Sequence, residues 1–123
     1  MPSVYEIEFY KTESGREPFS DYMRKLSKEN RTLEIAQIRT FLDRLRMHGM
    51  DVINDYPRTI RKLTNSGVWE LRPGGNRVFF FLFTGKTFVL LHAYPKHGQK
   101  APPSEIKQAE KEMKDHLRRN QHG

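Results

Sequence analysis

The chain has 123 residues, a formal net charge of +7 and no cysteine. This length accommodates one domain, and the lack of cysteine excludes disulfides, thiol catalysis and cysteine-ligated zinc. No apolar run approaches the roughly 20 residues of a membrane span, and the Met-Pro-Ser start is unlike a signal peptide. We therefore expect a cytoplasmic protein with a single domain over residues 1–119 and a frayed tail at 120–123.

The first half of the chain predicts one strand followed by two helices. Apolar and polar residues alternate over residues 3–10, which is the pattern of a strand. Pro18 suits the first turn of a helix that ends near Asn30, and a second helix is predicted from Thr32 to Met47. Apolar residues recur at helical spacing in both segments, so we expect an amphipathic helical hairpin.

The second half predicts three consecutive strands and a final helix. Residues 50–66 lack a clear period and are expected to be irregular. Runs of apolar and β-branched residues bounded by turn-forming residues predict strands at 68–72, 77–83 and 87–94. The last helix is expected after Pro102-Pro103, with Ser104 as its N-terminal cap.

The predicted order of elements, β-α-α-β-β-β-α, indicates an α+β domain. Its sheet should be small and mostly antiparallel, with one face covered by the helical hairpin and the first strand. Residues 77–83 are nearly all apolar, as expected of a central strand that is buried on both faces.

The excess positive charge is confined to the middle of the chain. Residues 56–104 contain eight basic residues and one acidic residue, Glu70, whereas the charges of the remaining residues balance. Such a segment favours a polyanionic partner, most often nucleic acid, although it is also compatible with a merely soluble basic surface. Arg58, Arg61 and Lys62 are candidates for a positive rim at which a polyanion docks.

Basic groups are expected to converge at one end of the sheet. Arg72 and Arg77 should face each other across the turn that joins their strands. The loop after the last strand, where functional groups often collect, adds a further set of polar side chains: Lys96, His97, Gln99 and Lys100.

The histidine of the last strand, His92, is expected to share a face with Phe88, Leu90 and Tyr94. The sequence predicts no carboxylate near His92 or His97, so a metal site would lack ligands. For the same reason we expect no carboxylate-pair hydrolysis, and we predict neither a metal nor another cofactor.

A site with Arg, Lys and His but no metal suits RNA cleavage. RNA carries its own nucleophile, the 2′-hydroxyl, so the protein needs to orient the phosphodiester, stabilise its charge and transfer protons. Tyr94 could stack on a base. Each candidate also has a structural interpretation: Arg77 as a solvated strand end, Arg72 as the partner of Glu70, His92 as a core histidine, and Lys96 and Lys100 as ordinary loop lysines.

Three stretches of the second half carry a resemblance to a known family. They read V-W-E-L-R at 68–72, R-V-F-F-F at 77–81, and L-L-H-A-Y at 90–94 followed by Lys96, Gln99-Lys100 and Pro102. Together they resemble the RelE/HigB family of toxins from bacterial type II toxin–antitoxin systems, in its phage-related HigB-like branch. One departure is Ala101, where the family often has threonine.

The resemblance implies a RelE-like fold and a toxin that cleaves messenger RNA on the translating ribosome, which inhibits translation. It also implies a cognate helix-turn-helix antitoxin, with contact to operator DNA only through the toxin–antitoxin complex, and no membrane partner. On the family pattern we assign catalysis to Arg72, Arg77, His92 and Lys96. We assign RNA binding to Arg58, Arg61, Lys62, Tyr94, Gln99 and Lys100.

Two other functions stay open on the sequence alone. A ParE-like toxin on a similar fold would inhibit DNA gyrase without cutting RNA, and a non-catalytic basic module would only bind its antitoxin or nucleic acid. The predicted convergence of phosphate-handling groups favours the endonuclease, because a gyrase inhibitor does not need them.

Overall fold

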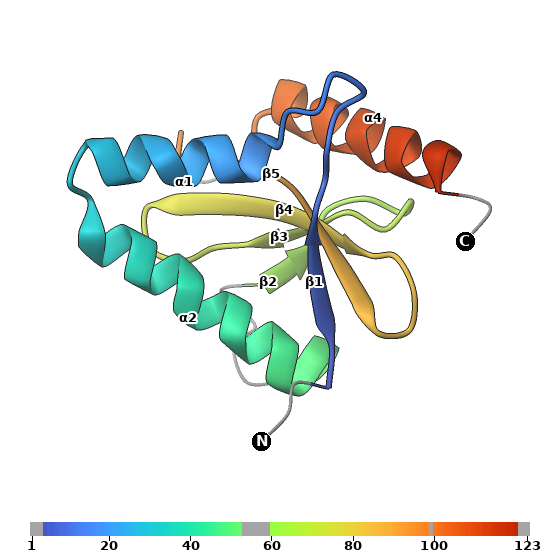
Figure 1. Cartoon of the computed structure of the whole chain (residues 1–123), viewed down its shortest axis with the longest axis horizontal. Helices are drawn as coiled ribbons and strands as arrows, with labels where there is room; N and C mark the ends of the chain where they lie inside the picture. Colours follow the sequence, from blue (N-terminus) through green and yellow to red (C-terminus); the bar gives the residue numbers. More distant parts are fainter. Residues whose placement is uncertain (1–3, 53–59, 99, 121–123) are drawn as a thin grey trace.

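The computed structural model describes residues 4–52, 60–98 and 100–120, in which three α-helices surround one five-stranded sheet (Figure 1). The strands are ordered β1-β5-β4-β3-β2, with β1 parallel to β5 and the other neighbours antiparallel. The elements are β1 (Glu6–Phe9), α1 (Pro18–Lys28), α2 (Thr32–His48), the short 3-10 helix η1 (Gly49–Asp51), β2 (Ile60–Lys62), β3 (Trp69–Leu71), β4 (Asn76–Leu82), β5 (Thr87–Pro95) and α4 (Pro103–Arg119).

The two N-terminal helices form the predicted hairpin. Pro18 occupies the first turn of α1, where its missing N–H is not needed. The chain reverses at Asn30, which adopts a left-handed conformation with φ 58°, and α2 follows after one further residue. Gly49 ends α2 with φ 60°, again in the region that favours glycine. The predicted helix bounds are therefore confirmed to within two residues.

The sheet has one strand more than predicted. Ile60–Lys62, within the segment expected to be irregular, forms β2 and pairs antiparallel with β3. In this register Ile60 lies opposite Leu71 and is itself buried. Three residues are too few to show a strand period, so only the pairing with β3 reveals this edge strand.

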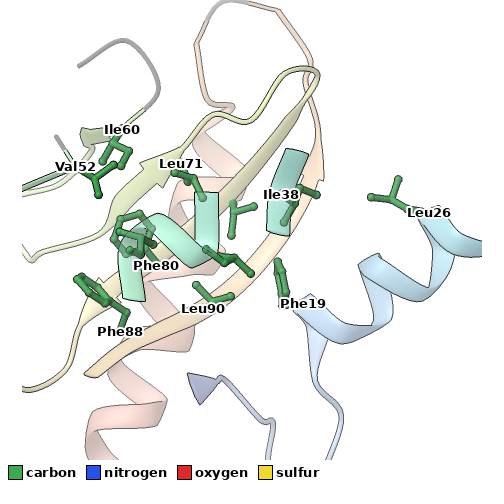
Figure 2. Packing of buried hydrophobic residues seen from close by; sticks show 12 residues of the cluster. Phe19, Leu26, Ile38, Val52, Ile60, Leu71, Phe80, Phe88 and Leu90 are labelled. Atoms are coloured by element: carbon green, nitrogen blue, oxygen red, sulfur yellow. The ribbon is translucent and has the colours of Figure 1, made fainter. Parts of the chain in front are cut away.

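Helices cover both faces of the sheet, which corrects the expectation that one face alone is covered. Helices α1 and α2 pack on one face, where Phe80 and Leu90 meet Phe19 and Ile38 in an apolar cluster (Figure 2). Helix α4 packs on the other face and lies apart from the hairpin in Figure 1. Its thin apolar stripe, with Ala109 and Met113, suffices because most of the cluster comes from β4 and β5: Phe79, Phe81, Val89, Leu91 and Tyr94.

A β-bulge changes the face on which His92 lies. Phe79 pairs with His92 but Phe80 pairs with Leu90, so the register of β4 and β5 shifts by one residue at Leu91. The extra residue places both Leu91 and His92 on the α4 face. The expectation that His92 shares a face with Phe88 and Leu90 is therefore wrong, whereas its shared face with Tyr94 is confirmed.

Helix α4 begins at Pro103, two residues earlier than a Ser104 cap would require. Its N-cap is Pro102, whose carbonyl oxygen accepts the backbone N–H groups of Glu105 and Ile106, and no side chain caps the helix. The prediction of Ser104 as cap is thus wrong. Pro102 is extended and Pro103 is already the first helical residue, a position that suits proline, so the helix starts before Ser104. None of the helices in the described ranges is long and apolar enough to cross a membrane.

Candidate functional site

Basic side chains meet at the end of the sheet where β3 turns into β4. Leu71 pairs with Val78, so Arg72, directly after β3, lies opposite Arg77 as predicted. Arg77 in turn pairs with Tyr94 near the end of β5. The backbone N–H of Lys96 donates to the carbonyl of Gly75 at 2.9 Å, which fastens the end of β5 to the turn. The structure therefore brings Arg72, Arg77, Tyr94 and Lys96 to one end of the sheet.

Arg77 is held more tightly than a strand-end arginine would be. Only 6% of its surface is exposed, and its Nη1 donates to the carbonyl oxygens of Gly74 at 2.9 Å and Asn76 at 2.8 Å. Burial and the charge of Arg72 lower the pKa of its guanidinium. A partly desolvated cation of this kind interacts more strongly with an incoming anion than an exposed one would.

Arg72 has the acidic partner that its sequence neighbours suggested. Its Nε lies 3.4 Å from Oε1 of Glu70, a carboxylate with only 2% exposure. Glu70 projects from β3 toward the α4 face, since it pairs with Phe79. The pair reduces the net charge at the site and orients Arg72 beside Arg77.

His92 lies between two carboxylates, which corrects the expectation that none is near. Its Nδ1 is 2.6 Å from Oε1 of Glu112, and its Nε2 is 3.1 Å from Oε1 of Glu105. Burial lowers the pKa of this imidazole, but the two carboxylates outweigh burial and raise it. His92 is therefore favoured as an imidazolium that ties β5 to α4, with both ring nitrogens engaged.

Sequence reasoning missed these acids because it counted charges by segment. Glu105 and Glu112 both follow the basic segment 56–104 in the sequence. They come close to His92 only when α4 packs on the sheet. A signal was present: the two glutamates are seven residues apart, on the helix face that also carries Ala109 and Met113. An acid on the buried face of a helix implies a basic partner.

Tyr94 lies between Arg77, with which it pairs, and the exposed loop that follows β5. It is buried, its ring meets the ring of Phe79 edge-on at 5.4 Å, and burial raises the pKa of its hydroxyl. Among the described residues the buried hydroxyl oxygen has no hydrogen-bond partner. The exposed ring of His97 stacks on Tyr94 at 6.0 Å between centroids and 16° between planes. His97, which the sequence analysis placed in this loop but assigned to neither catalysis nor RNA binding, thus lies beside the site.

The remaining candidates lie at the margins or outside the described residues. Arg61 and Lys62 are exposed on the edge strand β2, and they point to opposite faces because Arg61 pairs with Glu70 and Lys62 with Trp69. Only Arg61 therefore shares the face of the site. Lys100 is exposed after β5, whereas Arg58 and Gln99 lie outside the described residues.

The side chains described here do not form a metal centre: across residues 4–52, 60–98 and 100–120, no group of three or more His, Asp or Glu could hold an ion. The chemistry available is that of guanidinium, ammonium and imidazole groups beside an aromatic ring. Such groups can bind a phosphate, stabilise negative charge that develops on it, and transfer protons.

Comparison with known families identifies the group to which this architecture belongs. Residues 21–114, most of the chain, match the family described as phage-derived protein Gp49-like. The chain belongs to this family. Gp49-like proteins are a RelE/HigB-type toxin family, so the resemblance seen in the sequence is confirmed. A comparison with curated proteins found no match.

A solved structure shows that this Gp49-like chain has a RelE-like fold. The match is to the crystal structure of the archaeal RelE–RelB complex from Pyrococcus horikoshii OT3, with a TM-score of 0.54 and 16% sequence identity. The alignment covers 78% of this chain and 99% of the archaeal chain. The predicted fold class, an α+β domain of RelE type, is therefore confirmed, with β2 as the added strand.

Proposed function

We propose that this protein is the toxin of a type II toxin–antitoxin system and that it cleaves messenger RNA on the ribosome without a metal ion. Membership in a RelE/HigB-type family supports the toxin role. The observation that carries the endonuclease is the meeting of Arg72, Arg77 and Tyr94 at one end of the sheet, beside an exposed loop with Lys96 and His97.

The proposed reaction uses the nucleophile that RNA supplies. The 2′-hydroxyl loses its proton and attacks the adjacent phosphorus, and the bond to the 5′-oxygen breaks as that oxygen gains a proton. The products are a 2′,3′-cyclic phosphate and a 5′-hydroxyl. Arg77 and Arg72 stabilise the charge on the phosphoryl oxygens, as preorganised donors do in other transfers. To Lys96 and His97, in the loop that follows β5, we assign the transfer of the two protons.

The buried position of Arg77 is compatible with phosphate binding. A guanidinium has five N–H donors, and its Nη1 alone makes the two bonds to the turn carbonyls. Those bonds hold the group in place before substrate arrives, so less freedom is lost on binding. His92 contributes by holding β5 and its Tyr94 against α4, whose Glu105 and Glu112 it contacts.

The outer basic residues extend the binding surface along the RNA. Arg61 lies on the face of the site, Lys100 follows β5, and Tyr94 supports the stacked His97 on which a base can rest. We include Arg58 and Lys62 in the RNA-binding set because they belong to the basic middle segment of the chain, and Gln99 on the family pattern. Binding through several phosphates makes affinity fall steeply with salt.

The proposal also includes a protein partner. The archaeal structure that shares this fold is a complex of RelE with RelB. By analogy we propose a cognate antitoxin for this chain, of the helix-turn-helix type, which neutralises the toxin and brings the complex to operator DNA. Co-expression of the toxin with its neighbouring gene product should give a complex that purifies together and restores growth.

Cleavage mapping on purified ribosomes programmed with a defined messenger RNA tests the endonuclease. Primer extension should show new 5′ ends that require both the ribosome and this protein. Arg77→Ala should reduce cleavage at least about a hundredfold, the effect of removing one preorganised charge stabiliser. Arg24→Ala is the matched control, because Arg24 is an exposed arginine of α1 paired with Asp21.

Two outcomes would overturn the proposal. New ends that persist at full rate with Arg77→Ala would remove Arg77 from the site. A protein that stops growth but produces no new ends would indicate another target, and thymidine incorporation measured beside amino-acid incorporation would identify gyrase. A protein that affects neither growth nor RNA would be a binding module.

A further inference from the structure

A single buried amide connects the helical hairpin to the turn that carries Arg77. Asn76, the first residue of β4, is only 1% exposed. Its Oδ1 accepts a hydrogen bond from the hydroxyl of Tyr22 on α1, and its Nδ2 donates to Oε1 of Glu34 on α2 at 2.9 Å. The turn accordingly lies against the end of the hairpin where α1 passes into α2 (Figure 1). A buried amide is tolerated only when such partners are present.

The charges around this amide fix its direction. The hydrogen bond from Asn76 and the neighbouring Arg31 lower the pKa of Glu34, so Glu34 stays an acceptor. Burial raises the pKa of Tyr22 to about 12, so its hydroxyl keeps the proton that it donates. The ionised Glu34 can only accept, so it binds the Nδ2 of Asn76, and the Oδ1 is left to accept from the Tyr22 hydroxyl. The amide therefore has one orientation.

The turn held by Asn76 in turn holds the groups of the proposed site. Three successive carbonyls of the turn accept bonds from them: those of Gly74 and Asn76 from the guanidinium of Arg77, and that of Gly75 from the backbone N–H of Lys96. Gly74 has φ 65°, and a Cβ there would lie 2.6 Å from Oε1 of Gln37 on α2. The hairpin thus approaches the turn at two adjacent points.

We propose that Tyr22, Glu34 and Asn76 are positioning residues for Arg77. Through the turn they set where the guanidinium and the end of β5 lie, although none of the three reaches the phosphate. The inference deepens the proposed function and rests on it for its catalytic consequence. It differs from a purely structural role, in which the three residues would only help to pack the hairpin on the sheet.

Tyr22→Phe is the variant of choice because it removes one hydroxyl and leaves the ring. Tyr10→Phe is its matched control, since the Tyr10 hydroxyl also donates to a side chain far away in the sequence, Asp115 at 2.6 Å, but on the α4 side of the molecule. Both variants are compared for thermal unfolding, which establishes that each is folded at the assay temperature. Ribosome affinity and the single-turnover cleavage rate are then measured separately.

If the inference holds, Tyr22→Phe lowers the single-turnover rate about tenfold and leaves ribosome affinity within about twofold, because only placement is disturbed. In an Arg77→Ala background, Tyr22→Phe has no further effect, since the group that it positions is absent. Effects of the two changes that multiply, or an equal loss of rate with Tyr10→Phe, would show that the hydroxyl acts only on stability.

A readout that needs no cleavage separates this inference from the proposed function. The Arg77 side-chain N–H resonance, assigned by its loss in Arg77→Ala, should shift in Tyr22→Phe and stay unchanged in Tyr10→Phe. An unshifted resonance would overturn the positioning role whatever the activity. A shifted resonance in a protein that does not cut RNA would retain the positioning of Arg77 and overturn the endonuclease instead.

Discussion

The two faces of the sheet are built on opposite principles. The face under α1 and α2 is an apolar cluster in which Phe80, Phe88 and Leu90 meet the helices (Figure 2), and its buried polar residue, among those described, is Asn76. The face under α4 instead carries most of the buried polar and charged groups of the described chain: Glu70, Arg77, His92, Glu112 and His116. Both faces bury large aromatic side chains, so they differ in charge rather than in packing.

The apolar face therefore contributes mainly to the stability of the fold, whereas the charged face carries the proposed site. Apolar burial stabilises a fold directly, whereas a buried charge costs free energy unless it is paired. On the α4 face Glu70 is paired with Arg72, and His92 with Glu112 and Glu105. The proposed site therefore lies on the face where buried charges are paired. The helical hairpin contacts the turn of this site from the other face, through the hydrogen bonds of Asn76 with Tyr22 and Glu34.

The largest effect on folding is expected on the apolar face. Phe80→Ala removes a fully buried ring from the centre of the hairpin-side cluster and should lower the free energy of unfolding by about 3–5 kcal/mol. Much of the stability of a small domain would be lost. Urea unfolding followed by circular dichroism measures the change. Leu82→Ala in the same strand, where the side chain is 39% exposed, should cost far less; an equal cost would contradict the placement of the cluster.

A smaller loss is expected when a charge is removed from the α4 face. Glu112→Gln keeps the shape of the side chain but removes the carboxylate nearest His92, and should lower the free energy of unfolding by about 2 kcal/mol. The imidazole of His92 should then titrate at lower pH, because Glu112 raises its pKa more than Glu105, which alone remains to oppose burial. Proton NMR of the imidazole measures this. Glu110 lies on the same helix, two residues before Glu112 and therefore on a different side of it, so Glu110→Gln should leave the His92 titration unchanged.

The sequence predicts the hairpin face far better than the α4 face, and the reason is physical. Periodicity and turn-forming residues report which positions of a segment are buried and where it ends, so they predict the three described helices and every described strand except β2. They do not report pairing between distant segments. The bulge at Leu91 depends on the register of β4 against β5, and β2 exists only because β3 lies beside it.

The candidate site was predicted in its basic half and missed in its acidic half. Arg72 and Arg77 are neighbours across one turn, so local chain geometry brings them together. Glu112 is 20 residues from His92 and reaches it only after α4 has packed. A prediction that treats each segment separately gives the site too much positive charge. The polar bridge from Tyr22 to Asn76, 54 residues apart, is invisible for the same reason.

The smallest expected effect concerns pH and distinguishes two histidines of the α4 face. The folded pKa of His92 is raised by Glu112 and Glu105 despite burial, so its contribution is complete below the unfolded value of about 6.5 and is lost as pH rises through the folded pKa. Burial among aromatic rings, with Arg119 nearby, lowers the pKa of His116 against the opposing pull of Glu8 and Asp115. Its contribution is therefore present above about 6.5 and is lost as pH falls.

The free energy of unfolding should thus pass through a maximum near neutral pH, with one histidine responsible for each side. In urea unfolding measured from about pH 5 to 9, His92→Phe combined with Glu112→Gln should flatten the alkaline side and His116→Phe the acidic side. The second change is needed because His92→Phe alone leaves the buried carboxylate of Glu112 without its partner. Phenylalanine suits His116 because its ring already meets Phe83 edge-on at 4.9 Å, so this variant should be folded and more stable in acid. A His92→Phe/Glu112→Gln protein that still loses stability at alkaline pH to the same extent would show that the pair of His92 with Glu112 does not hold α4. The contrast between an apolar and a charged face would then rest on Arg77 and on the pair of Glu70 with Arg72, on the same face near the turn between β3 and β4.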